Sequence, residues 1–206
     1  MKPMPKAHFL KAGRRPQNGA DSRGETTAMM SPIAEAAEPT SKPQGTLPVR
    51  LLTHGLTIFI ALVFIDSLRF KFSNAPKTQI IFGDLDRWAA SLGAPGVFAQ
   101  GGVFSQYVIG GAELLASVIL IGTMVLKPYR FLQPVGAILA IAIMSGAISF
   151  HLFTPLGVNV DNDGGALFFT ACGVWLGGFA LVFLRRRELG ELLRRLGAFF
   201  APSGKL

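Results

Sequence analysis

The chain has 206 residues, of which 50% are hydrophobic and only 16% are charged, which excludes a typical soluble domain because such domains are roughly 25% charged. The net charge of +8 does not indicate nucleic-acid binding, since the lysines and arginines lie in the two tails and at the ends of apolar runs. The single cysteine, Cys172, excludes a disulfide framework or a cysteine-rich metal site within one chain.

Residues 1–48 are predicted to form a disordered, basic tail. The stretch is rich in proline, glycine, serine, lysine and arginine, as in KAGRRPQNGADSRGE, and it lacks an apolar segment long enough for the core of a signal peptide. A segment of such low hydrophobicity does not bury enough apolar surface to offset the entropy of ordering. Met29 or Met30 offers a second start position, which would remove most of this tail.

Four apolar runs follow, at residues 51–70, 103–126, 131–153 and 164–184. Each has about 20 residues, the length that a helix needs to cross about 30 Å of hydrocarbon. Helices satisfy their own backbone hydrogen bonds where water is absent. We therefore expect an all-α membrane protein, a bundle of four transmembrane helices over residues 49–187 that is embedded in a lipid bilayer.

Lysine and arginine are distributed unevenly between the two sides that four spans create. The N-terminal tail to Arg50, the connection KPYR and the segment from Arg185 hold sixteen of the twenty, and the first loop holds the other four. Cytoplasmic loops carry the excess of these residues. We therefore expect a multi-pass membrane protein with both termini in the cytoplasm.

Two segments outside the spans have helical periodicity. The first outer loop has apolar residues at helical spacing, and they are Ile81, Leu85, Trp88 and Leu92. We interpret it as a short amphipathic helix lying on the outer surface, with packing over the end of the bundle as the alternative. Residues 188–206 combine leucines on one side with several arginines, which predicts a basic amphipathic tail at the membrane surface.

Glu113 is the one carboxylate near the middle of a predicted span. Gln106, Gly110 and Ser117 share its helical face, which makes a stripe of small and polar residues. Small residues mark helix–helix contacts in membranes, so Glu113 is expected to point into the bundle. Ionisable groups at this depth are costly and serve as candidate functional sites. Two roles remain open: a proton-carrying or ligand-binding acid, or a buried polar group that only holds helices together.

Further polar residues lie toward the outer ends of the predicted spans. Asp66 and Arg69 are three residues apart and can pair on their own helix. Lys71 and His151 fall at a similar depth. We expect these four residues and Glu113 to form one polar cluster, although spacing alone does not show that the side chains meet.

The segment NVDNDGG precedes the fourth span. It lacks the glycine position and the later glutamate of a calcium loop, so no metal site is predicted. Asp163 is predicted to be the N-cap of the fourth span, at the positive end of the helix dipole. Gly173 and Gly177 form a GxxxG pattern, which indicates a helix–helix contact.

Four stretches together resemble the DoxX family of small four-span bacterial membrane proteins. They are RFKFSNAP, WAASLGAPGVFA, GGAELLASVILIG and FHLFTPLGVNVDNDGGALFF, and the resemblance covers about residues 50–187. The positions that match the family pattern are Lys71, Gly110, Gly111, Glu113, His151, Asp163, Gly164 and Gly165. The long basic N-terminal tail departs from the family's compact form.

The resemblance implies a role next to redox chemistry. Some members of the family are subunits of membrane oxidoreductases that pass electrons from sulfur compounds to quinone, and others are linked to oxidative-stress complexes. We therefore expect an accessory or quinone-associated subunit in the bacterial inner membrane, without activity of its own. It would have no covalently held cofactor and would have oxidoreductase subunits as partners; self-association is left open. The alternatives are a small proton-coupled transporter that uses Glu113, or a structural or assembly factor.

Overall fold

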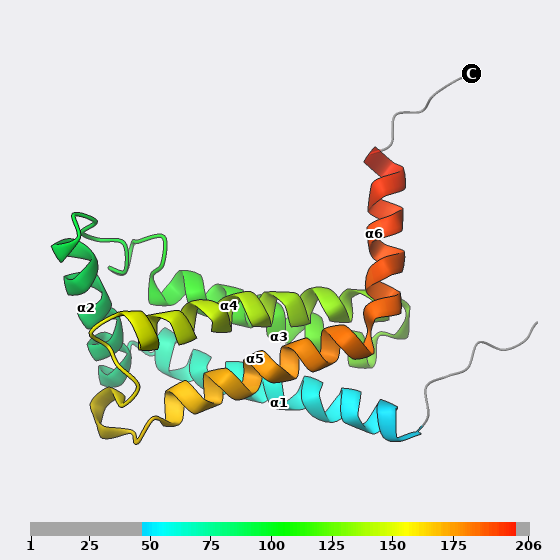
Figure 1. The fold of residues 1–206 in the computed structure, drawn as a ribbon, viewed down its shortest axis with the longest axis horizontal. Coiled ribbons are helices and arrows are strands. Elements are labelled where there is room, and N and C mark those ends of the chain that lie inside the picture. Colours follow the sequence, from blue (N-terminus) through cyan, green and yellow to red (C-terminus); the bar gives the residue numbers. More distant parts are fainter. Residues whose placement is uncertain (1–46, 201–206) are drawn as a thin grey trace, which may run out of the picture. The chain divides into compact units, whose positions relative to one another are not determined.

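The computed structural model describes residues 47–200, and the side chains of residues 47–199. The predicted disordered tail lies outside this range apart from Leu47 and Pro48, and so does the end of the C-terminal tail. The described residues are helical and contain no strand. The α-helices are α1 (Leu47–Phe72), α2 (Pro76–Ser91), α3 (Gln106–Val125), α4 (Gln133–Phe153), α5 (Ala166–Leu184) and α6 (Arg186–Phe200), and the 3-10 turns are η1 (Lys127–Leu132) and η2 (Val160–Asn162) (Figure 1).

Four helices in the described range are long and apolar enough to cross a membrane: α1, α3, η1 with α4, and α5. This finding confirms the predicted number of apolar helices and supports a multi-pass membrane protein. Their outward side chains include Leu62, Leu115 and Leu176, each more than half exposed. Large apolar surfaces of this kind are costly in water and are typical of surfaces that face lipid.

The helix boundaries differ from the predicted runs for local reasons. α3 begins three residues after the start of the predicted apolar run because Ser105 caps the helix. The Ser105 Oγ accepts a hydrogen bond from the Val108 N–H at 3.3 Å. α5 begins at Ala166 because Gly164 and Gly165 adopt positive φ angles, which end the preceding loop. Hydropathy alone does not reveal these caps and turns, since the flanking residues are apolar or small as well.

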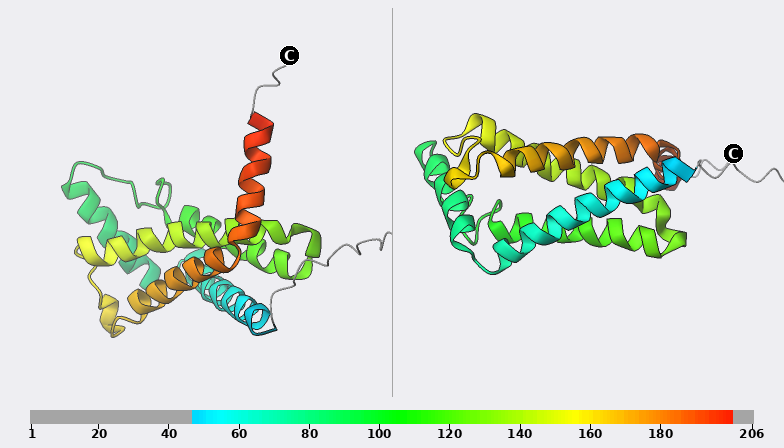
Figure 2. Two further views of the ribbon diagram at one scale, coloured as in Figure 1. Left: turned by 45° about the vertical axis from the view of Figure 1, so that its right-hand side comes forward. Right: turned by 90° about the horizontal axis from the view of Figure 1, so that it is seen from below.

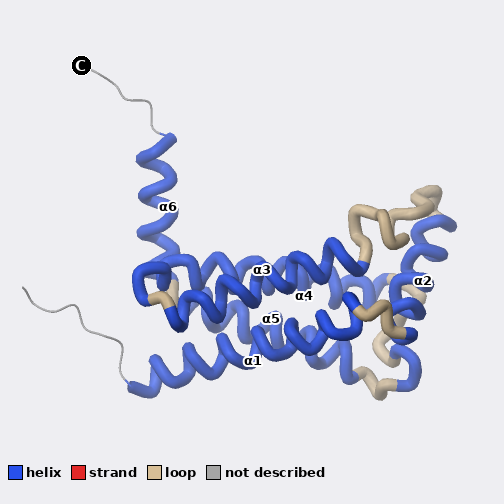
Figure 3. The backbone as a smooth tube through the Cα atoms, turned by 180° about the vertical axis from the view of Figure 1, so that it is seen from behind, coloured by secondary structure: helices blue, strands red, loops and turns tan. Residues whose placement is uncertain are grey.

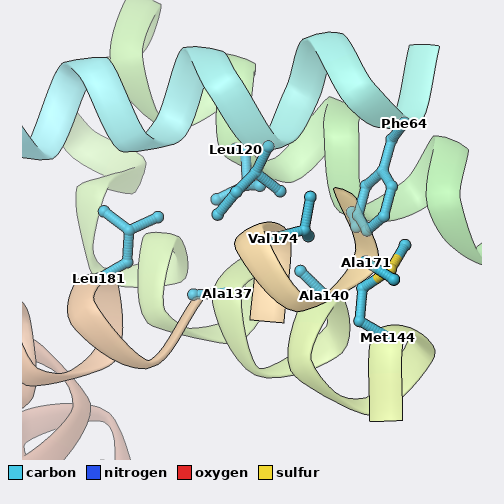
Figure 4. Close-up of a cluster of buried hydrophobic side chains, with 10 residues drawn as sticks. Phe64, Leu120, Ala137, Ala140, Met144, Ala171, Val174 and Leu181 are labelled. Carbon is cyan, nitrogen blue, oxygen red and sulfur yellow. The ribbon is translucent and has the colours of Figure 1, made fainter. Parts of the chain in front are cut away.

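The four long helices pack as a bundle in which α1 and α4 each contact both α3 and α5 (Figures 1 and 3). We call the end covered by α2 the α2 end, and the opposite end, where η1 and α6 lie, the α6 end. The main core occupies the centre of the bundle and includes Phe64, Leu120, Val174 and Leu181, all fully buried (Figure 4).

Glycines bring the helices together in the half of the bundle nearer the α6 end. A methyl group added at Gly178 would lie 2.7 Å from Cγ1 of Ile141 on α4. Gly173 and Gly177 lie against α1, where the Phe59 ring would be 3.5 Å from a methyl group at Gly173. The predicted contact at the two glycines therefore exists, with α1 as the partner. Such contacts allow close backbone approach.

α2 is the predicted short helix of the first loop. Its Leu85 and Ala89 are buried together with Phe98 of the following loop, and Phe150 of α4 packs against this cluster. The apolar side of α2 thus contacts the protein itself, as the alternative interpretation had it. Leu92, one of the four residues that defined the pattern, lies just past the helix and is 68% exposed.

The C-terminal segment forms an amphipathic helix, α6. It is the red helix in Figure 2. It begins immediately after α5 and contacts η1 and α4. Leu189 and Leu192 near its start are half-buried, whereas Leu193 and Leu196 are exposed. Only the first part of α6 therefore packs against the bundle.

Candidate functional site

A cavity of about 840 Å³ lies between the long helices at the α2 end. All four of them and α2 contribute to its walls, which are mainly apolar and include Val63, Ile109, Ile143 and Ala147. This volume falls within the range of about 300–1,000 Å³ that is typical of small-molecule pockets.

Lys71 and Glu113 form an ion pair on the wall of this cavity. Lys71 Nζ lies 3.0 Å from Oε1 and 3.1 Å from Oε2 of Glu113, and it also donates to Ser67 one turn earlier in α1. The Glu113 side chain is 3% exposed and that of Lys71 14%. The ammonium therefore uses its donors on protein oxygens, while the carboxylate keeps acceptor capacity facing the cavity.

Gly110 gives the Lys71 side chain room to reach Glu113. A methyl group at Gly110 would lie 3.4 Å from Cδ of Lys71 and 3.6 Å from Leu68. The small residue one turn before Glu113 thus lets α1 cross α3 closely. Gly111 has no atom within 4 Å of the corresponding position, so it does not contribute to this contact.

Gln106 lies on the predicted stripe but contacts a different set of groups. Its Nε2 donates to the Lys71 carbonyl oxygen at 2.8 Å and to Oδ1 of Asn74 at 2.9 Å, and its Oε1 accepts from Gln79 at 2.7 Å. These bonds join the end of α1, the start of α2 and the start of α3. Gln106 therefore has a structural role, holding the backbone next to Lys71 in place.

Asp66 and Arg69 form the predicted pair within α1, at 2.7 Å. Both side chains are more than half exposed, although Asp66 also lines the cavity. Within the described residues, no hydrogen bond or ion pair joins them to the Lys71–Glu113 pair. The predicted five-residue cluster is therefore divided into two separate ion pairs and His151, which bonds elsewhere, and all three lie at one end of the bundle.

His151 lines the cavity from α4 and is 8% exposed. Its Nδ1 lies 2.6 Å from the Gly157 carbonyl oxygen. A carbonyl only accepts hydrogen bonds, so Nδ1 carries a proton. In the neutral ring, Nε2 is then the nitrogen that can accept a hydrogen bond. Phe168 packs edge-on against the imidazole, with 5.7 Å between ring centroids.

Asp163 anchors the loop before α5. Its carboxylate accepts hydrogen bonds from the N–H groups of Val160, Gly165 and Leu167, at 2.9–3.1 Å. The predicted N-cap role is shifted, because Gly165 occupies the cap position and Asp163 reaches the first turn from two residues earlier. Lys77 of α2 approaches the same carboxylate at 3.9 Å, and both residues line the cavity.

Several groups determine the pKa of Asp163. Burial acts to raise the pKa of this carboxyl, but the hydrogen bonds from Leu167, Gly165 and Val160 and the charge of Lys77 outweigh burial and lower the pKa. Asp163 is therefore ionised at neutral pH. The adjacent Gly165, at φ +85°, is required because a side chain there would be strained and would meet Phe169.

Three further residues of this region are not among those predicted from the sequence. They are Ser67, Asn74 and Lys77, which bond respectively to Lys71, to Gln106 and to Asp163. Ser67 precedes Lys71 by one helical turn, and that spacing could have identified it. Asn74 and Lys77 depend on the path of the chain between α1 and α2, which hydropathy does not predict.

Glu113 and Lys71 together provide the main polar chemistry inside the apolar cavity. A paired ammonium and carboxylate can fix the polar head of a ligand by donating and accepting hydrogen bonds, and the carboxylate can exchange a proton. No group of three or more histidine, cysteine, aspartate or glutamate side chains that could hold a metal ion occurs among the described residues.

Comparisons with known proteins do not add a family assignment. No protein-family model, no curated protein and no solved structure matches the chain. The site is therefore interpreted from its own geometry.

Proposed function

We propose that this chain is an integral membrane protein that binds a small amphipathic, quinone-like molecule in the cavity at the α2 end. It would act as an accessory subunit, in the manner of the DoxX family that its sequence resembles, next to a partner oxidoreductase. The observation that carries this proposal is an apolar cavity of about 840 Å³ with a buried Lys71–Glu113 pair on its wall.

The cavity fits the chemistry of a quinone. Its apolar walls suit a ring with a hydrocarbon tail, and His151 and the Lys71–Glu113 pair offer polar contacts for the ring oxygens. A bound quinone would supply two-electron, two-proton redox chemistry. The protein's own residues would bind and orient it, exclude water and hold a proton at Glu113. A partner subunit would carry the other redox centre.

Mass spectrometry of the purified protein tests this proposal. After extraction in mild detergent, we expect quinone at close to one molecule per chain for the wild type and a clear loss for Glu113→Gln. Gln133→Leu is a matched control, since it removes another buried polar side chain, whose Nε2 donates to Thr57 at 2.8 Å outside the cavity. Quinone at the same ratio to lipid as in the bulk membrane would contradict the proposal.

A proton-coupled transporter is the second candidate, favoured by the position of the Lys71–Glu113 pair inside a candidate span. Protein in liposomes would then move a solute in response to a pH gradient, and Glu113→Gln would abolish the movement. The third alternative is a structural or assembly factor. In that case Glu113→Gln would only lower the stability of the protein.

A further inference from the structure

Charge pairing differs between the two ends of the bundle. At the α2 end every lysine and arginine of the first loop and its flanks has a carboxylate partner, and the pairs are Arg69–Asp66, Lys71–Glu113, Lys77–Asp163 and Arg87–Asp84. At the α6 end, Arg185 pairs with Glu188 at 2.9 Å. The other cations of that end have no ion pair with a carboxylate in residues 47–199, and they are Arg50, Lys127, Arg130, Arg186, Arg187, Arg194 and Arg195.

Six of these seven cations lie on two elements that are distant in sequence but in contact. α6 contacts η1, the short connection between α3 and α4 that contains Lys127 and Arg130. Figure 1 shows that α6 turns steeply away from α5 and runs across the direction of the long helices. If those helices cross a membrane, α6 lies along its surface and carries its arginines at the level of the lipid headgroups.

The side chains of α6 are arranged for such a position. Leu189, Leu192, Leu193 and Leu196 share one face, by helical spacing. Leu193 and Leu196 are 60% and 47% exposed because they lie beyond the part of α6 that packs against the bundle. Arg186 and Arg195 flank the leucine face on its two sides. Helices of this pattern bury their apolar side among lipid chains while arginines reach the headgroups.

We propose that α6 and η1 form a docking surface for the headgroups of anionic phospholipids. Charge complementarity favours this occupant, since cations without a carboxylate partner lie on both elements, next to an exposed leucine face. Anionic lipid surfaces attract such basic residues, and each contributes roughly a fivefold factor to binding. The surface lies at the opposite end of the bundle from the cavity and does not depend on what the cavity binds.

A fluorescent label on α6 tests the proposal. Cys172→Ser removes the native cysteine, Leu196→Cys places an environment-sensitive dye on the leucine face, and the full chain is reconstituted in nanodiscs. We expect quenching by acrylamide, a neutral quencher, to fall at least about fivefold when phosphatidylglycerol is added to phosphatidylcholine. High salt should reverse the protection, because it screens the attraction between exposed charges.

A matched pair of variants separates headgroup binding from simple burial of leucines. Arg194→Gln with Arg195→Gln should restore quenching in the anionic discs to the level of neutral discs, since glutamine preserves helix formation but not charge. Arg69→Gln with Arg87→Gln makes the same charge change at the α2 end and should leave the protection intact. Equal protection of the label in neutral and anionic discs would overturn the proposal. Exposure of the label in both kinds of disc would also overturn it and would indicate a protein partner for the leucine face.

Discussion

Glu113 and Lys71 show how a costly residue is accommodated inside an apolar helix. A carboxylate among hydrocarbon is destabilising unless a cation or a set of donors faces it. Lys71, 42 residues away in the chain, provides both, and Gly110 leaves space for its side chain. The pair is thus neutral overall and remains on the wall of a cavity, where it is available to a ligand.

A double-mutant cycle measures the coupling between the two residues. Lys71→Met or Glu113→Gln alone is expected to lower the free energy of unfolding by about 2 kcal/mol, because each leaves one buried partner unpaired. The double variant should cost clearly less than the sum of the two. The measurement is unfolding in detergent micelles titrated with a denaturing detergent. Strictly additive losses would show that the two side chains do not interact.

Asp163 gives a pH-dependent contribution to stability. Its pKa is lower in the folded protein than in the unfolded chain, so the stabilisation is present above the unfolded value of about 4 and is lost as the pH falls through the lower folded value. Asp163→Asn should therefore be less stable than the wild type at pH 7, and the difference should shrink in acid below about pH 4. A difference that stayed constant in thermal unfolding across this range would contradict the role of the charge.

At the scale of helices, small residues set how closely α5 approaches its neighbours. The GxxxG pattern predicts contacts at Gly173 and Gly177, and both residues lie against α1. Gly178, which is outside the pattern, lies closer to its neighbour, Ile141 of α4. A GxxxG spacing identifies one face of a helix and does not show which neighbouring position meets the bulkier partner. That depends on the crossing of α4 and α5, which only the folded structure gives.

Alanine substitutions in α5 test this ranking. Gly178→Ala is expected to destabilise the protein by about 1–3 kcal/mol, because the new methyl group would lie 2.7 Å from Ile141 and 3.3 Å from the Ala137 carbonyl oxygen. Gly173→Ala is the control, since the closest atom of Phe59 is at an ordinary 3.5 Å. Equal unfolding free energies for the two variants would contradict the close packing of α4 and α5.

Across the whole molecule, hydropathy predicted the parts better than their arrangement. Runs of about 20 apolar residues define helices that satisfy their own backbone, so the four long helices could be located within a few residues from sequence. The cavity could not be located from the sequence, because it results from how the helices separate toward the α2 end. Likewise, the spacing of Asp66, Arg69 and Glu113 suggested one cluster, whereas the structure separates Asp66 and Arg69 from Glu113.

The orientation in the membrane remains a prediction from the distribution of lysine and arginine. In a Cys172→Ser background, a cysteine at Ser91, at the end of α2, should react with a membrane-impermeant maleimide in intact spheroplasts. A cysteine at Gly190, in α6, should react only after the membrane is permeabilised. The reverse labelling would place both termini outside the cytoplasm, and labelling of both sites in intact spheroplasts would contradict an even number of spans.

The most direct test of the central claim is equilibrium binding of a short-chain benzoquinone to the protein in nanodiscs. We predict saturable binding to the wild type that Glu113→Gln weakens about tenfold or more, as expected when a ligand loses a hydrogen bond to a charged group. Gln133→Leu, away from the cavity lining, should bind as the wild type does. Absence of saturable binding, or equal affinity in wild type and Glu113→Gln, would contradict a ligand site at the Lys71–Glu113 pair.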